Sequence, residues 1–143
     1  QKEKFDLIDD AVCAVRSAQE EGIVAGGGLA LFECSESIAS ALPTFSGAES
    51  QAMEILIEAY QAPFRQILEN AGKDPNEVIS YIIYKDSNTG YNLKTGEYGD
   101  MFKMGVVDPL KVTKNALKNA VSVATTILST NAIVTMARSY ETK

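Results

Sequence analysis

Three consecutive glycines, Gly26, Gly27 and Gly28, separate a charged stretch from an apolar one in EEGIVAGGGLAL, residues 20–31. A glycine costs about 0.5–1 kcal/mol relative to alanine in regular structure, so three together indicate an unusual turn or the close approach of another group. A run of bare backbone N–H groups that leads into a helix N-terminus also favours an anion such as phosphate. The motifs GxxxxGK[ST] and GxGxxG are both absent, because the triplet runs directly into LALF. A phosphate site and a plain inter-helix turn are therefore both open.

Acid–base chemistry in this chain has few candidates, because the sequence contains no histidine. This excludes Ser-His-Asp and Cys-His pairs and HExxH metal sites. Any catalysis would use carboxylates, lysines or a bound metal, and Asp10 is one such carboxylate. The apolar residues Phe5, Ile8, Val12 and Val15 form one stripe of a helix and place Asp10 on the opposite, polar face. A carboxylate in that position is usually a solvated surface charge.

The composition is that of one soluble domain. The chain has 143 residues, 45% of them hydrophobic, and a net charge of -6. Such a charge repels phosphate backbones and anionic lipids, so we expect no nucleic-acid or membrane partner. Without a signal peptide or a bilayer-length apolar run, a cytoplasmic location is expected. Cys13 and Cys34 are expected to be small buried hydrophobes in a reducing compartment. The start lacks methionine and lies within a helical pattern, which favours a piece of a longer protein.

The pattern of apolar residues predicts a mainly α fold. A first helix over residues 2–21 should end at Gly22, and a second over residues 29–41 should stop before Pro43. A third should start at residue 46 or 47, restart after Pro63 and end at Gly72. A short helix should follow, with Asp74 as its N-cap.

The second half of the chain predicts a small β-hairpin, one long helix and a C-terminal strand. The segments YNL and EYG, in residues 85–108, are flanked by turn residues. Asp108 should cap a helix that begins at Pro109, whose apolar stripes cover most of its circumference and place it inside a core. Its lysines should form a solvated stripe. The segment NAIVTM, residues 131–136, has the composition of a strand, yet no other apolar strand is evident to pair with it. Its partner should belong to a missing segment or another subunit.

Four segments of the chain together resemble one protein family. They are IDDAVCAVRSAQEEGIVAGGGLAL, QAPFRQILENAG, GYNLKTGEYGDMFKMGVVDPLKVTKNALKNAVSVA and NAIVT. In this order and with similar gaps they resemble the C-terminal third of the group I chaperonins, the 60-kDa barrel-forming ATPases that fold proteins. The resemblance covers essentially the whole chain. It implies that residues 1–21 end the intermediate domain and that residues 22–143 form the C-terminal half of the equatorial ATP-binding domain.

The resemblance also implies roles for the residues already singled out. Asp10 matches the intermediate-domain aspartate that swings onto the nucleotide and helps to position the attacking water and the metal. Gly26, Gly27 and Gly28 match the glycine turn beside the nucleotide, with Gly27 as the first contact. The resemblance thus implies that the glycines let a nucleotide lie against bare backbone.

The remaining implied contacts with the nucleotide lie in the hairpin and just after it. Tyr91, Asn92 and Leu93 match the edge that holds the adenine, Val106 matches a residue that packs near the base, and Asp108 matches the carboxylate that bonds the ribose. Without the resemblance, Tyr91 and Asn92 are ordinary hairpin residues.

The function implied is that of an ATP-hydrolysing, isomerase-type folding chaperonin. Its cofactor would be ATP or ADP with Mg²⁺, and its partners would be unfolded client proteins, a co-chaperonin and identical subunits in rings. In the family, the phosphate loop, the magnesium-binding aspartate and the apical client-binding surface lie outside the matched region, so these 143 residues alone should be inactive and supply no metal site.

Two alternatives remain open. One is a free-standing helical scaffold domain with a chaperonin-like fold that binds no nucleotide. The other is a small enzyme for a phosphate ligand, which would need an acid–base group that the sequence does not offer. Departures from the family pattern are Leu93 in place of a common alanine, Asn131 in place of an acidic residue, and an end without a Gly-Gly-Met tail.

Overall fold

The computed structural model describes residues 2–132 and residue 134, and within these it is mainly helical, as predicted. The five α-helices are α1 (Lys2–Glu21), α2 (Leu29–Ala41), α3 (Ala48–Asn70), α4 (Pro75–Ile82) and α5 (Leu110–Leu128), with a short 3₁₀ turn, η1 (Leu42–Thr44), after α2. The strands are β1 (Ile23–Ala25), β2 (Thr89–Asn92), β3 (Glu97–Asp100) and β4 (Val107–Pro109). Half of the predicted strand at residues 131–136 lies outside the described residues, and residues 131, 132 and 134 are not in a strand.

The predicted helix ends follow from local backbone chemistry. Gly22, with φ +89°, ends α1, and Gly72, with φ +71°, follows the C-cap of α3. Both residues take the left-handed conformation that glycine adopts without a steric penalty. Asp74 caps α4 as predicted, because its carboxylate accepts the N–H of Asn76 at 2.9 Å.

The predicted break at Pro63 is wrong, because α3 runs through this residue without ending. Proline removes one backbone hydrogen bond from a helix. The turn that follows it carries Phe64 and Leu68, both buried, and the Phe64 ring lies 5.2 Å from that of Phe32 in α2. Packing against α2 therefore stabilises the part of α3 that follows Pro63, and the helix continues through the proline.

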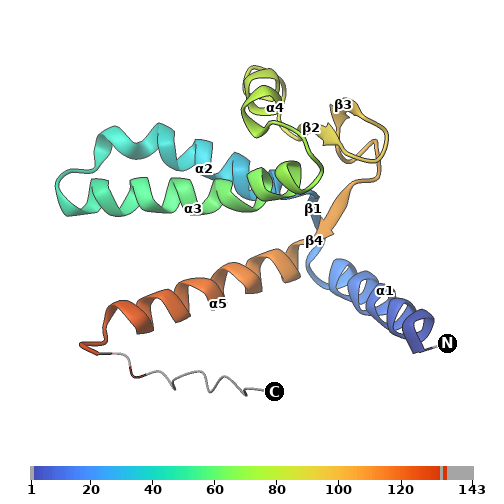
Figure 1. The fold of residues 1–143 in the computed structure, drawn as a ribbon, viewed down its shortest axis with the longest axis horizontal. Helices are drawn as coiled ribbons and strands as arrows, with labels where there is room; N and C mark the ends of the chain where they lie inside the picture. The colour runs from blue at the N-terminus through green and yellow to red at the C-terminus, as the bar shows by residue number, and fades with distance from the viewer. Residues whose placement is uncertain (1, 133, 135–143) are drawn as a thin grey trace, which may run out of the picture.

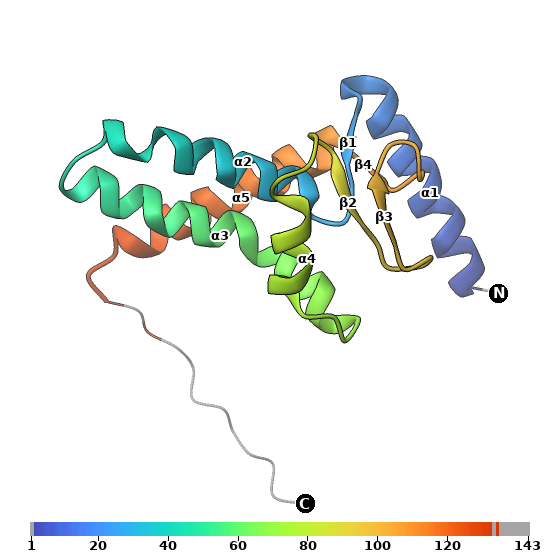
Figure 2. The same ribbon diagram turned by 90° about the horizontal axis from the view of Figure 1, so that it is seen from above.

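The core lies where α2, α3 and α4 meet. Figure 1 shows α2 and α3 side by side, with α4 close to the hairpin of β2 and β3, and Figure 2 shows the same arrangement from above. The buried apolar side chains come from these helices, from β1 and from the loop after β3, and they are Ala25, Leu29, Phe32, Phe64, Leu68, Val78, Ile82 and Met101.

Two small antiparallel sheets complete the fold. The predicted hairpin is present, with Tyr91 of β2 opposite Tyr98 of β3. The second pair was not predicted: β1 pairs with β4, so that Val24 lies opposite Asp108. Asp108 is therefore a strand residue and not the helix cap that was predicted, and Pro109 takes the N-cap position of α5 without a side-chain hydrogen bond. The prediction that residues 131–136 lack a partner strand within the chain is not tested, because β1 and β4 pair with each other and half of that segment lies outside the described residues.

Helices α1 and α5 leave the β1–β4 pair and diverge from each other (Figure 1). The predicted core position of α5 is wrong for this chain, because no residue of α5 is buried and Leu128 is 85% exposed. The stripe of α1 is uncovered as well, with Phe5 at 73% exposure.

Cys13 and Cys34 are exposed, contrary to the prediction, since α1 is uncovered and Cys34 lies away from the core side of α2. No helix in the described part of the chain has the length and apolar character needed to cross a membrane.

Substituting Gly28 should test how closely α2 and α3 pack. A Cβ atom on Gly28 would lie 2.9 Å from the backbone nitrogen of Phe64, and the residue has φ +78°. We expect Gly28→Ala to lower the free energy of unfolding by about 2–5 kcal/mol, from left-handed strain plus overpacking. Gly72→Ala is the control, since Gly72 has φ +71° with nothing within 4 Å of the added atom. Urea unfolding should show a loss of only about 1–2 kcal/mol there. Equal losses would contradict the packing argument.

Candidate functional site

A hollow of about 410 Å³ lies beside the glycine turn, between α3, the hairpin and the loop that follows β3. Its size falls in the range of about 300–1,000 Å³ typical of small-molecule sites. Its lining is mostly apolar and consists of Gly27, Phe64, Ile67, Leu68, Tyr91, Asn92, Leu93, Lys94, Met101, Met104, Gly105 and Val106. Five of these are residues for which the sequence predicted a nucleotide contact: Gly27, Tyr91, Asn92, Leu93 and Val106.

The three glycines differ in what surrounds them. Gly26 is buried, and a Cβ atom there would lie 3.1 Å from the backbone of Val106, whose carbonyl accepts the Gly26 N–H at 3.0 Å. Gly28 lies against the backbone of Phe64 in the same manner. Gly27 has φ +66°, meets only the tip of Met101 at 3.5 Å, and lines the hollow. The outer two glycines thus permit close backbone approach, and the middle one presents bare backbone to the hollow.

The turn of the hairpin holds Asn92 and Leu93 at the hollow. Asn92 is only 9% exposed, and its side-chain oxygen accepts the N–H of Lys94 at 3.0 Å. Its backbone carbonyl accepts the N–H of Gly96 at 2.8 Å. These bonds close the turn, and Leu93 stands at the rim with 38% of its surface exposed.

The loop after β3 forms the opposite wall. The Val106 N–H donates to the carbonyl of Met101 at 2.9 Å, and the Met101 N–H donates to the carbonyl of Asn88 at 3.0 Å. Met101 is 1% exposed. Val106 is therefore fixed to the buried core while it lines the hollow.

Asp108 and Asp10 do not line the hollow. Asp108 is exposed in β4, two residues beyond Val106. Asp10 is exposed in the middle of α1, which projects from the β1–β4 pair (Figure 1). The structure thus gathers five predicted residues around the hollow, packs Gly26 and Gly28 beside it, and leaves the two carboxylates outside. The roles predicted for all nine stay predictions.

Comparison with known proteins supplies the family. The family model described as "TCP-1/cpn60 chaperonin family" matches residues 2–138. The chain belongs to the TCP-1/cpn60 chaperonin family. It is also similar to a solved structure of a group III chaperonin in the open state, with 33% sequence identity and a TM-score of 0.74. The match covers 82% of this chain and 25% of that one, so the chain spans about a quarter of the length of this relative. The predicted family is confirmed, and the narrower assignment to group I stays a prediction.

Two ion pairs join α1 to α5 in this chaperonin chain, and the sequence did not indicate them. Lys111 pairs with Glu20, and Lys114 pairs with Glu21. The hydrogen bond from Lys111 to Glu20 raises the pKa of the lysine. The sequence predicted a solvated stripe of lysines on α5, whereas Lys111 and Lys114 also form ion pairs with α1. No local pattern could show the pairing, because about 90 residues separate the partners.

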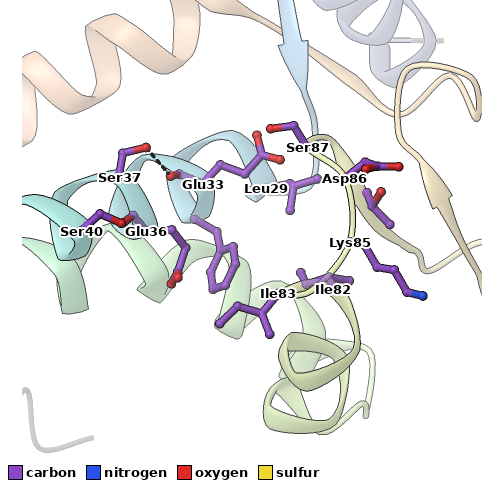
Figure 3. Close-up of a pocket in the computed structure, with 12 residues that line it drawn as sticks. Leu29, Glu33, Glu36, Ser37, Ser40, Ile82, Ile83, Lys85, Asp86 and Ser87 are labelled. Carbon is purple, nitrogen blue, oxygen red and sulfur yellow. Dashed lines mark hydrogen bonds between the residues drawn. The ribbon is translucent and has the colours of Figure 1, made fainter.

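A second hollow of about 290 Å³ lies between α2 and the connection from α4 to β2 (Figure 3). Its lining includes Glu33, Glu36 and Asp86 but no predicted site residue. The Glu33 carboxylate accepts the N–H of Asn88, and the Ser37 hydroxyl donates to the carbonyl of Glu33 at 3.2 Å. Among the described residues, no group of three or more histidine, cysteine or acidic side chains is placed to hold a metal ion.

The hairpin carries a cluster of tyrosines that sequence reasoning missed. The Tyr98 ring lies 4.1 Å from that of Tyr81 in α4 and 4.8 Å from that of Tyr91. Partial desolvation, at a residue that is 36% exposed, and the nearby Glu77 carboxylate raise the pKa of Tyr98. The spacing of Tyr91 and Tyr98 around a turn indicates that they face each other across two strands, but nothing in the sequence indicates that Tyr81 joins them.

The raised pKa of Tyr98 predicts a difference at alkaline pH. A phenol whose pKa is raised by folding contributes stability that is complete below its unfolded pKa and is lost as pH rises through the folded value. As the pH rises above about 10, the free energy of unfolding of the wild type should therefore fall more steeply than that of Tyr98→Phe. Urea unfolding of both proteins across this range measures the difference. Parallel curves would contradict the assignment.

Proposed function

We propose that this chain supplies the base-binding wall of an ATP site in a chaperonin subunit. The observation that supports this most is the convergence on one hollow of Gly27, Tyr91, Asn92, Leu93 and Val106, which come from three separate segments. The sequence resemblance implied a nucleotide contact for each of them. A hollow with apolar walls and a few placed polar groups is typical of a small-molecule site.

The hollow fits one end of ATP and not the other. Leu93, Val106 and Met104 offer apolar surface to a flat base, and the turn at Asn92 offers backbone and amide groups. Lys94 is the charged residue in the lining, and the described residues hold no metal-binding cluster. Phosphates with Mg²⁺ would need several charged ligands. We therefore propose that residues elsewhere in the subunit hold the phosphates and the metal, which when bound stabilises the charge of the transferred phosphoryl group.

Asp10 is the proposed catalytic group. Phosphoryl transfer depends mainly on positioning and charge stabilisation, so a carboxylate that orients the attacking water suffices without histidine. Asp10 lies outside the hollow, and its role requires that α1 move toward the nucleotide. Gly22, with φ +89° and no atom within 4 Å of its missing Cβ, is the point where α1 can turn.

The uncovered helices support the proposal that the chain works within a larger subunit. On α5, Val123 is 58% and Ile127 is 51% exposed, and they are one helical turn apart. Apolar faces of this kind usually mark an interface. In the complete protein we propose rings of identical subunits that act with a co-chaperonin on unfolded clients in the cytoplasm. A free-standing scaffold domain without nucleotide is the competing function, and ATP binding separates the two.

Removing the Asp10 carboxylate should separate binding from hydrolysis. In the full-length protein, Asp10→Ala should lower ATP turnover by about 100-fold or more, because the attacking water loses its orienting group. ATP affinity should stay within about twofold, because Asp10 does not line the hollow. Phosphate release measures the first, and equilibrium titration with ATP measures the second.

Asp9→Ala is the matched control, since Asp9 is the exposed neighbour of Asp10 in α1. It should leave turnover unchanged, and the isolated 143-residue chain should show no turnover. Equal loss of turnover in both variants, or equal loss of binding and turnover in Asp10→Ala, would point to a structural role for this helix.

Charges placed on α5 should test whether its apolar face is covered in the complete subunit. The double variant Val123→Lys, Ile127→Lys should leave the helicity of the isolated chain unchanged, because both positions are exposed in it. In the full-length protein it should prevent ring assembly, because two charges would be buried.

The matched control is Asn115→Lys, Asn119→Lys, which adds the same charge one helical turn apart at exposed polar positions of α5. Circular dichroism and size-exclusion chromatography measure both variants. Normal rings from the Val123 and Ile127 variant would contradict a covered α5.

A further inference from the structure

Three tyrosine rings form a continuous stack from α4 to the hollow. The Tyr81 ring lies 4.1 Å from that of Tyr98, and the Tyr98 ring lies 4.8 Å from that of Tyr91. Tyr91 and Tyr98 face each other across the two strands of the hairpin, and Tyr91 lines the hollow. Both ring pairs are tilted, at separations where aromatic rings attract each other.

A lysine lies over each end of the stack. The Lys73 ammonium is 5.7 Å from the centre of the Tyr91 ring, and the Lys85 ammonium is 5.1 Å from that of Tyr81. A cation over a ring face within about 6 Å is attracted to it. The rings of Tyr91 and Tyr81 are therefore each in contact with a lysine as well as with Tyr98.

The hairpin needs such an anchor at its free end. At its root, Gly90 lies so close to Met101 that an added Cβ would be 2.8 Å from the sulfur. The turn of the hairpin, residues 93–96, is by contrast exposed. An isolated two-stranded hairpin is marginally stable in water. Tyr91 packs against the buried core from β2, and the contact of Tyr98 with Tyr81 ties β3 to α4, a helix with the buried side chains Val78 and Ile82.

We infer that Tyr98 is a positioning residue for the base-binding edge. Its ring bridges Tyr81 of α4 and Tyr91 of β2, and so it keeps Asn92 and Leu93 at a set distance from the wall formed by Val106. This inference rests on the proposed function of the hollow. The Tyr98 hydroxyl takes part in no hydrogen bond among the described residues, so the ring, and not the hydroxyl, is the part that acts.

Binding and turnover of ATP by the full-length protein test the inference. Tyr98→Leu removes the central ring and should weaken ATP binding by about 2- to 12-fold, the effect of losing an aromatic pair. The turnover number at saturating ATP should stay within about twofold, because the edge binds ground state and transition state alike. Tyr98→Phe keeps the ring and should restore wild-type affinity. Tyr84→Leu is the matched control, since Tyr84 is 89% exposed, and it should bind ATP as the wild type does.

Each outcome decides one question. If the wild type does not bind ATP, the proposed function fails. If the wild type binds and Tyr98→Leu binds equally well, only the role of Tyr98 fails. Loss of turnover number and melting temperature together with affinity, or no rescue by Tyr98→Phe, would also overturn it. Should Tyr98→Leu not assemble, Tyr81→Leu removes the half-exposed outer ring instead, and unchanged affinity there would overturn the inference.

Discussion

The close approach of bare backbone at the glycine turn is the constraint on which the other features depend. Gly26 lies against the backbone of Val106, and Gly28 lies against that of Phe64, at distances that leave no room for a Cβ atom without a shift. One contact joins β1 to β4, and the other joins α2 to α3. Gly27, between them, is left to face the hollow. The same three residues thus set both the packing of the core and the position of one wall of the site.

The turn also separates a well-packed half of the chain from a weakly held one. On one side, Phe64, Leu68 and Met101 are almost fully buried. On the other, α1 is held by the β1–β4 pair, by exposed ion pairs with α5, and by the Leu110 N–H that donates to the Gly22 carbonyl at 3.0 Å. Exposed ion pairs contribute little to stability and are screened by salt. A helix held in this manner can change its orientation without disrupting the core, which is compatible with the role proposed for Asp10.

Features set by neighbouring residues could be predicted from the sequence, and features set by distant ones could not. Gly22, Gly72 and Asp74 mark helix ends through their own backbone or side chain, and the predictions there are confirmed. The pairing of β1 with β4 joins segments more than 80 residues apart, and three-residue strands are too short to show a pattern. The prediction that Asp108 caps α5 was wrong for that reason.

The exposed position of α5 could not be predicted either. The all-round apolar pattern of this helix predicts burial, but no other described segment covers it, and in the proposed function the cover would come from the rest of the subunit. The resemblance implied a shared site for nine residues, and five of them line the hollow. The stack of tyrosine rings beside the hairpin turn could not be predicted, because Tyr81 approaches Tyr98 only through the placement of α4.

The division of charge argues for a site completed by other residues. An apolar hollow with one lysine in its lining, in a chain of net charge -6, offers a base a favourable surface and offers a triphosphate almost nothing. Attraction between opposite charges is strongest when cationic groups surround an anion in a site from which water is excluded. In the proposed function, the wall described here would recognise the base, and a second wall would supply the cations. Under this proposal neither wall alone would hold both ends of the nucleotide, so tight binding and hydrolysis would depend on both walls, with α1 closing over them.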